Sequence, residues 1–186
     1  MNLKTNLISN LNLIFKNMKN IINYINEQYS INTKPKTKEQ LKQLIENRIK
    51  QEGPKCNLND IDVSAITDMS YLFENSVFNG DISMWDVSHV TTMEDMFAES
   101  EFNGNIAKWN VGNVENMESM FEATNFNGDI SKWDVSNVKY MSFMFAFSDF
   151  NRDISMWNVS HVEGHFKMFN GGELEHQFNK QPKFKN

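Results

Sequence analysis

The chain has 186 residues, of which 40% are hydrophobic, and a formal net charge of −6. This size is typical of one domain with an appendage. Residues 1–56 carry 10 Lys or Arg against 4 Asp or Glu, whereas residues 57–172 carry 5 against 18. Because binding to nucleic acid needs a clustered basic face, the acidic body argues against nucleic acid as a partner.

Residues 1–33 are predicted to form an amphipathic N-terminal helix. The longest apolar run, Leu13 to Phe15, is too short for a secretory signal or a transmembrane segment. We interpret the helix as a cap or as a self-association element that acts through residues 7–25. An interfacial membrane helix and a translation start at Met18 are the alternatives. The apolar stripe alternates spacings of four and three and consists of Leu7, Leu11, Ile14, Met18, Ile21 and Ile25.

Residues 34–56 are predicted to form a capping helix. Thr37 and Gln40 have the spacing of a capping box, and Gly53-Pro54 is a stop signal. A repeat array needs a cap that shields its terminal unit from water, and we expect this helix to supply it. Its buried stripe is expected to be Leu41, Leu44 and Ile45.

Residues 57–173 repeat one pattern with a period of 24 residues. The unit is FNGDISMWDVSHVTTMEDMFAESE at 78–101, and residues 57–75 are a shortened first copy. A fixed period of this size indicates a solenoid of stacked units. The clearest markers of the period are Trp85, Trp109, Trp133 and Trp157.

Each unit is predicted to be a strand followed by a helix. Trp85 and Val87 alternate around an acidic residue, as in a strand with one buried face. Met93, Met96 and Phe97 instead have the i, i+3, i+4 spacing of a helix. The expected fold class is therefore α/β: a right-handed, leucine-rich-repeat-like solenoid of about five 24-residue strand-helix units. A plain β-helix is the alternative, and it would need strand-like alternation through residues 93–97.

Asn-Gly dipeptides separate one unit from the next, and they favour a tight turn. The fourth copy has Arg152 in place of glycine, so its turn is expected to avoid positive φ. The asparagines are expected to stack as a ladder whose amides satisfy backbone groups left unpaired at the bend. They are Asn79, Asn103, Asn127 and Asn151.

The units resemble those of the BspA-type leucine-rich repeat proteins of bacteria, which read much like FNGDISxWDVSxVxxMxxMF. The resemblance covers about two thirds of the chain. It implies a surface or secreted protein that binds other proteins, in an adhesin-like or host-interaction role. Because function depends on sites rather than on folds, the resemblance does not identify a partner.

An exposed face is expected along the strand half of the units, where alternate side chains point outward and would line a concave binding surface. The candidate residues form columns across the repeats: Met84, Lys108, Lys132 and Met156; Asp86, Asn110, Asp134 and Asn158; and His89 and His161. The alternative is a solubilising face without a partner.

Three aromatic residues distinguish the helical half of the third full unit. Tyr140, Phe143 and Phe147 stand where the other full units have polar or small residues. Their spacing turns them away from the core columns of a helix, and an exposed apolar patch usually marks a contact. We expect the patch to receive either a partner protein or the apolar face of the N-terminal helix. The alternative is that the C-terminal tail, through Phe178 or Phe184, folds back over it.

No catalytic, cofactor or metal site is predicted. Cys56 is the only cysteine, so no intrachain disulfide can form. His161 and His165 have i, i+4 spacing but lack a third metal ligand. Residues 174–186 are predicted to be a loose basic tail. We therefore expect a protein-binding repeat module that is not an enzyme, with a self-associating structural spacer as the alternative.

Overall fold

The computed structural model describes residues 13–22 and 33–184. The chain divides into two compact units, Met1–Lys34 and Pro35–Asn186, which are described separately. In the first unit, residues 13–22 are helical, in agreement with the prediction for this part of the segment. Residues 7–12 and 23–25 of the predicted self-association segment lie outside the described residues. The exposed apolar side chains of the described part are Leu13, Ile14, Phe15, Met18, Ile21 and Ile22.

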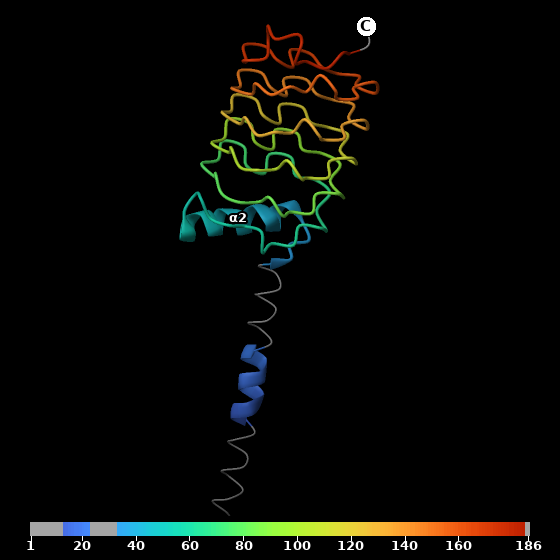
Figure 1. Cartoon of the computed structure of the whole chain (residues 1–186). Coiled ribbons are helices and arrows are strands. Elements are labelled where there is room, and N and C mark those ends of the chain that lie inside the picture. Colours follow the sequence, from blue (N-terminus) through green and yellow to red (C-terminus); the bar gives the residue numbers. More distant parts are fainter. Residues whose placement is uncertain (1–12, 23–32, 185–186) are drawn as a thin grey trace, which may run out of the picture. The chain divides into compact units, whose positions relative to one another are not determined.

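The second unit begins with helix α2, Lys38–Glu52, at the base of a stack of coils (Figure 1). Thr37 is its N-cap, and the Thr37 hydroxyl accepts a hydrogen bond from the Gln40 amide at 3.3 Å. The helix ends at Gly53, which has a φ of 89°. Its buried side chains belong to the same core as the first coil and are Leu41, Leu44 and Ile45. The predicted start, stop and buried stripe of this helix are all present.

Five successive coils follow α2: residues 57–77, 78–101, 102–125, 126–149 and 150–173, here called coils 1 to 5. Figure 1 shows them lying one above the other, in chain order. They are joined by isolated parallel bridges between residues one repeat apart: Asn57 with Asp81, Asp68 with Thr92, Thr92 with Asn116, Asn116 with Tyr140, and Tyr140 with Gly164. The 24-residue period of the sequence is therefore the length of one coil.

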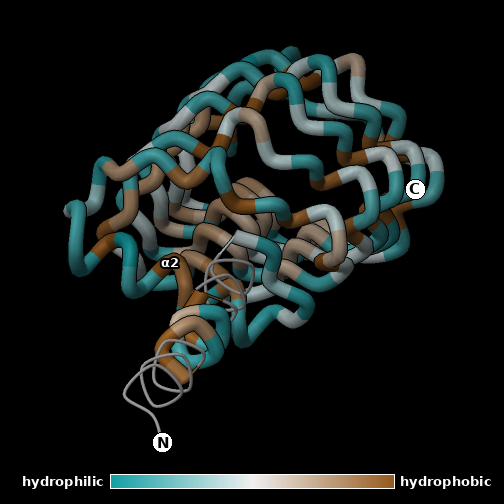
Figure 2. Tube along the Cα trace, turned by 90° about the horizontal axis from the view of Figure 1, so that it is seen from below, coloured by the Kyte–Doolittle hydropathy of each residue, from teal (hydrophilic) through white to brown (hydrophobic). Residues whose placement is uncertain are grey.

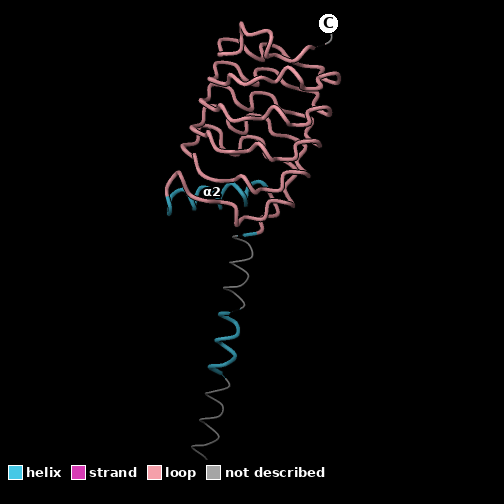
Figure 3. Tube along the Cα trace, viewed as in Figure 1, coloured by secondary structure: helices cyan, strands magenta, loops and turns pink. Residues whose placement is uncertain are grey.

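The coils are not strand-helix units, so the predicted α/β leucine-rich-repeat-like solenoid is wrong. Within the described residues, helix is confined to the N-terminal segment and α2, and no strand is present (Figure 3). The supposed strand half is a series of turns, in which the Trp85 amide donates to the Ile82 carbonyl and the Val90 amide to the Val87 carbonyl. The plain β-helix fails for the same reason, because the coils are linked by single bridges instead of continuous strands.

The supposed helical half is a turn ladder, a name used here for residues 93–100 and their equivalents in the other coils. In coil 2 the amides of Met93, Asp95, Phe97 and Glu99 donate to carbonyls of coil 3 at 2.8–3.0 Å. Between them, i→i+3 bonds close turns such as that from the Met96 amide to the Met93 carbonyl. Met93, Met96 and Phe97 therefore point inward with the predicted i, i+3, i+4 spacing. The spacing results from consecutive turns that are bonded to the next coil and not from a helix.

The turn ladder requires positive φ at two columns of non-glycine residues. Asp95 has a φ of 52° and Glu99 a φ of 54°, and the residues one repeat away share this conformation. For an L-residue the left-handed region costs roughly 1–2 kcal/mol. The packing and hydrogen bonds between coils must offset that cost. The set comprises Tyr71, Asn75, Asp95, Glu99, Ser119, Ala123, Phe143, Phe147 and Lys167.

The core consists of aromatic columns that run through the stack. Phe97 stacks on Phe121 with ring centroids 5.6 Å apart, and Phe102 stacks on Phe126 at 6.2 Å. Figure 2 looks along the stack, and hydrophobic and hydrophilic residues intermix along each coil, as inward and outward side chains alternate. Each tryptophan is buried, and its indole N–H donates to a carbonyl of the preceding coil, as Trp109 does to Ile82 at 3.1 Å.

The asparagine ladder predicted at the unit boundaries is confirmed. The Asn79 side-chain oxygen accepts from the Asn103 amide at 3.0 Å, and the same bond recurs from Asn127 and Asn151 to the preceding coil. The reason for the neighbouring glycines differs from the prediction. Gly80 does not have positive φ; a Cβ there would lie 2.7 Å from the Phe78 ring and 2.0 Å from the Cys56 carbonyl oxygen.

The segment after coil 5 is not a loose tail over its described residues, 174–184. Leu174 is 1% exposed, and the Lys180 carbonyl accepts from the Ile154 amide at 2.9 Å. The Lys180 ammonium donates to the Asn151 side-chain oxygen at 2.7 Å and so ends the asparagine ladder. Phe184 stacks on His165 at 4.0 Å. Lys180, one of the basic residues that suggested a loose tail, instead bonds an acceptor that a further coil would have used.

Candidate functional site

The outermost column on the first half of the coils contains Met84, Lys108, Lys132 and Met156. All four are exposed, and the two methionines are 78% and 89% exposed. Ser83, Met84, Asn105 and Lys108 line a shallow hollow of about 230 Å³ between coils 2 and 3. The structure therefore places this column outward, as predicted.

The other two candidate columns on this half make bonds that hold the coils themselves. The Asp86 carboxylate accepts from the hydroxyl and amide of Ser88 at 2.6 and 3.1 Å, and these bonds lower its pKa. Asp134 does the same with Ser136, and the side-chain oxygens of Asn110 and Asn158 accept the equivalent amide bonds. These residues are exposed turn-formers.

The histidine column has a similar structural role. The His161 Nδ1 lies 3.0 Å from the Ser136 carbonyl oxygen of the preceding coil. Asn113 and Asn137, in the same column, donate to the equivalent carbonyls at 2.6 Å. His89 contacts its neighbour Ser88, with its Nδ1 3.2 Å from the Ser88 hydroxyl. No described pair of these histidines converges on one point.

A different surface, on the turn ladder of coils 4 and 5, gathers exposed aromatic side chains. Tyr140 is 40% exposed and Phe147 58%, while Phe143 is half-buried. Phe143 meets Phe166 of coil 5 edge to face, with centroids 5.5 Å apart, and Phe166 is 63% exposed. Tyr140, Phe143, Phe147 and Phe166 are called the aromatic patch below. Sequence reasoning missed Phe166, although its column holds Ser or Glu in every other coil.

Gly171 of coil 5 leaves room for the Phe147 ring, because a Cβ at that position would stand 2.6 Å from the ring. A Cβ at Gly164 would stand 3.4 Å from the Tyr140 ring, which is an ordinary contact distance. The inward residues of the same segment, Met144 and Phe145, are 0% and 1% exposed. The core of coil 4 is thus complete without the patch, as predicted, although the segment is a turn ladder and not a helix.

The same flank is acidic on the lower coils. Burial, together with the nearby charges of Glu94, Glu74 and Glu122, raises the pKa of Asp95 to about 6. The Tyr71 hydroxyl donates to the Glu94 carboxylate at 2.8 Å, and this bond raises the pKa of Tyr71 to about 12. Glu74, Glu94, Asp95 and Glu122 are called the acidic cluster below. Asp95 and Phe143 occupy the same column two coils apart, so the cluster and the patch share one flank.

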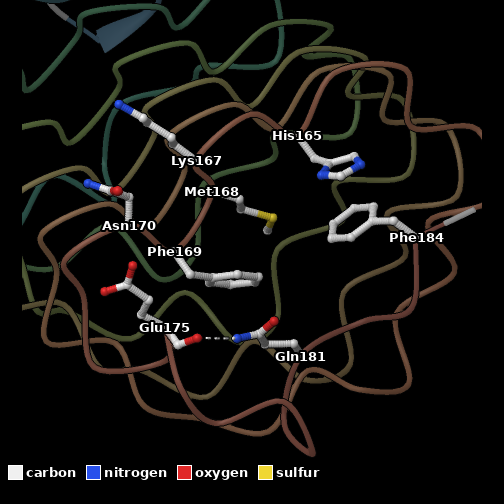
Figure 4. A pocket seen from close by; sticks show the side chains of 8 residues that line it. All are labelled: His165, Lys167, Met168, Phe169, Asn170, Glu175, Gln181 and Phe184. Atoms are coloured by element: carbon white, nitrogen blue, oxygen red, sulfur yellow. Dashed lines mark hydrogen bonds between the residues drawn. The ribbon is translucent and has the colours of Figure 1, made fainter. Parts of the chain in front are cut away.

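A cavity of about 410 Å³ lies at the upper end of the stack (Figure 4). The Phe169 ring, the last of its column, lies between the stacked His165 and Phe184 on one side and Glu175 with Gln181 on the other. The Gln181 side chain donates to the Glu175 carbonyl at 3.2 Å. The remaining lining residues are Lys167, Met168 and Asn170.

A family model described as "Mycoplasma protein of unknown function, DUF285" matches residues 39–147 and 101–184. The two matches overlap and together extend from α2 to the segment that covers coil 5. The chain belongs to the DUF285 family. This is a BspA-like repeat family, so the resemblance seen in the repeat unit holds at that level. The comparisons do not establish the leucine-rich type of repeat.

No curated protein and no solved structure matches this DUF285 chain. Both DUF285 matches include the acidic cluster's Glu122 and the aromatic patch's Tyr140, Phe143 and Phe147, and the second also includes Phe166.

The described part of this DUF285 chain contains neither a metal-binding cluster nor a membrane-spanning helix. Within residues 13–22 and 33–184, no group of three or more His, Cys, Asp or Glu side chains could hold a metal ion. None of the helices described there is long and apolar enough to cross a membrane. Cys56 is buried, and burial raises the pKa of its thiol.

Proposed function

We propose that this protein is a protein-binding repeat module whose binding surface is the aromatic patch with the adjoining acidic cluster. The observation that supports this most directly is the exposure of the patch. Phe147 and Phe166 are 58% and 63% exposed, and the core of coil 4 is filled without them. Aromatic side chains are enriched at the centres of protein interfaces, where they contribute large contact areas.

The patch has no evident benefit for folding. Phe143 and Phe147 have φ values of 58° and 55°, a conformation that favours glycine or asparagine over a bulky residue. In coil 3 the same two positions are Ser119 and Ala123, with the same backbone conformation. A coil therefore forms with small residues there, and the two phenylalanines add exposed apolar area that folding does not require.

The charge around the patch indicates the chemistry of a partner. Residues 57–172 carry 18 acidic against 5 basic residues, and the acidic cluster lies on the same flank as the patch. Complementary potentials speed encounter and exclude wrong partners. We propose a partner surface with apolar side chains in its centre and Lys or Arg at its rim. The resemblance to BspA-like proteins makes a surface or secreted setting the one to test first.

The experiment uses substitutions taken from the protein's own repeats. The double variant Phe143→Ser, Phe147→Ala gives coil 4 the residues of coil 3. The matched control, Met84→Lys, Met156→Lys, gives coils 2 and 5 the residues of coils 3 and 4 on the opposite half. The full-length chain and both variants are immobilised, and the proteins that they retain are identified. Each retained protein is then purified, and its affinity for wild type and for both variants is measured.

The proposal predicts that at least one protein binds wild type and the lysine control alike and binds the patch variant about tenfold more weakly or worse. Equal binding to the patch variant would move the site elsewhere on the chain. A wild-type chain that binds nothing specifically would contradict the protein-binding function and favour a spacer.

A further inference from the structure

The turn ladder is directional, because every amide in it that bonds another coil donates to the coil above. Four amides in each of coils 1 to 4 donate to carbonyls of the next coil, at 2.7–3.0 Å. In coil 4 these are the amides of Met141, Phe143, Phe145 and Phe147, which bond the carbonyls of Gly164, Phe166, Met168 and Asn170. The lower edge of each ladder therefore presents carbonyls and the upper edge presents N–H groups.

Coil 5 has the same amides but no coil above it. The equivalent donors are the amides of His165, Lys167, Phe169 and Gly171. Gly171 donates to the Glu175 carboxylate at 3.0 Å. The other three have no acceptor among residues 13–22 and 33–184. Backbone N–H groups inside a folded protein are normally hydrogen-bonded. These three amides lack such a bond within the described residues, and we call them the open donor edge.

The segment after coil 5 covers the asparagine side of the stack and reaches the turn-ladder side at two points, where Phe184 stacks on His165 at 4.0 Å and the Glu175 carboxylate bonds the Gly171 amide. Lys180 bonds Ile154 and Asn151, which lie on the asparagine side, and Gln181 bonds the Leu174 carbonyl at 2.6 Å. On the turn-ladder side it leaves the cavity of about 410 Å³ beside Phe169 (Figure 4). The donor edge and the cavity are therefore adjacent.

A second copy of this chain does not fit the open edge. If the upper edges of two copies met, N–H donors would face N–H donors and no hydrogen bonds could form between them. The lower edge, which carries the matching carbonyls, is at the end covered by α2, where Lys38 bonds Asp68 and Ser70, and Lys42 bonds the Tyr71 carbonyl. The occupant must instead supply carbonyls from an accessible backbone.

We propose that an extended segment of a partner protein adds to this edge as a sixth coil. This inference rests on the proposed protein-binding function and specifies the form of the bound partner. The segment places alternate carbonyls on the amides of His165, Lys167 and Phe169, in the way that strand addition uses an open sheet edge. The coils already present define the side chains it needs. Coil 3 sets Met117, Met120 and Phe121 inward over coil 2, so the segment carries apolar residues at k, k+3 and k+4.

The probe is a synthetic peptide with the sequence of residues 113–125, NVENMESMFEATN, which forms this layer inside the protein. A control peptide has serine at the positions of Met117, Met120 and Phe121. Amide hydrogen exchange of the ¹⁵N-labelled full chain is followed by NMR with each peptide at up to millimolar concentration. The inference predicts that the amides of His165, Lys167 and Phe169 exchange at least about tenfold more slowly with the first peptide only.

Two variants at one position locate the peptide. Asn170 lines the cavity and is half-buried. Asn170→Trp fills the space and should abolish the protection, whereas Asn170→Ala should retain it. If Asn170→Trp does not fold, the wild-type exchange measurement alone still decides. Unchanged exchange at the three amides, or equal protection by the control peptide, would overturn the inference.

The patch variant Phe143→Ser, Phe147→Ala separates this inference from the proposed function. The peptide should still protect the edge in that variant, because the donor amides of the edge belong to coil 5 and the substitutions are in coil 4. A partner that binds through the patch while the edge stays unprotected would contradict only the sixth-coil inference. Edge protection in a chain that binds no natural partner would contradict the proposed function, while the capacity of the edge to add an extended segment would stand.

Discussion

The indole Nε1 of Trp109 donates a hydrogen bond to the carbonyl oxygen of Ile82, 3.1 Å away in the preceding coil. Trp109 is 4% exposed, and its ring lies 6.5 Å from that of Trp85 at an angle of 3°. The same bond recurs from Trp85, Trp133 and Trp157. Each tryptophan therefore fills the core of its coil and satisfies a buried carbonyl of the coil below.

Trp109→Ala should lower the free energy of unfolding by about 3–5 kcal/mol, because it leaves a cavity and removes one of the two hydrogen bonds that the Ile82 carbonyl accepts. The exposed neighbour Lys108 provides the control, since Lys108→Ala should change the free energy of unfolding by less than about 0.5 kcal/mol. Urea denaturation of both variants makes the comparison. Equal stabilities would refute the inward and outward assignment of the two side chains.

Ala123→Gly distinguishes the turn ladder from the helix that the sequence pattern suggested. Ala123 is exposed with a φ of 52°. In a helix this change costs about 1 kcal/mol. At positive φ, glycine relieves backbone strain while increasing the entropy of the unfolded chain, so stability should be unchanged or slightly higher.

The control for this measurement is Ala146→Gly, at a buried alanine of coil 4 that lacks positive φ. That variant should be destabilised by roughly 1 kcal/mol or more, because it loses a buried methyl group and gains unfolded-state entropy. Thermal melts compare the two variants. Similar destabilisation of both would indicate that the ladder backbone differs from the one described.

The sequence predicted the inward columns and the asparagine ladder, since both depend on a period that any stacked coil preserves. It did not reveal the backbone. Met93, Met96 and Phe97 face inward with the same spacing in a helix and in consecutive turns. The positive φ of Glu99, Phe143 and Phe147 is not a preference of those residues, so it arises from bonds between coils. Phe166 was missed because its contact with Phe143 crosses coils at an offset of 23 residues.

The acidic cluster should make stability depend on pH between about 4 and 6. The folded-state pKa of Asp95 is raised to about 6 from an ordinary value of 3.8, by burial and by neighbouring carboxylates. The folded chain therefore binds more protons than the unfolded chain in this range. The associated stability is present below the ordinary pKa and is lost as pH rises through 6.

Asp95→Asn removes this titration. The unfolding free energy at pH 7.5 minus that at pH 4.5 should therefore be more positive in the variant than in wild type. Only the difference is diagnostic, because asparagine also tolerates the φ of 52° at this position better. Asp86→Asn is the control, since hydrogen bonds from Ser88 lower the pKa of Asp86 and shift its effect to more acidic pH. An unchanged pH profile in Asp95→Asn would contradict the assignment.

Calcium, zinc and EDTA should each leave the melting temperature unchanged. An ion that bound the native state would raise it by mass action, and the described residues contain no cluster of His, Cys, Asp or Glu suited to a metal. Differential scanning fluorimetry with each additive suffices. A rise of several degrees with calcium would point to the column Asp81, Asn105, Asp129 and Asp153 as a cation site.

The affinity of a purified partner for the Phe143→Ser, Phe147→Ala variant tests the binding surface most directly, provided that unfolding free energy is measured on the same samples. The two phenylalanines lie outside the core, so stability should stay within about 1 kcal/mol of wild type. Affinity should fall about tenfold or more. A variant that is clearly destabilised yet binds its partner with unchanged affinity would show that the aromatic patch serves folding and is not the binding surface.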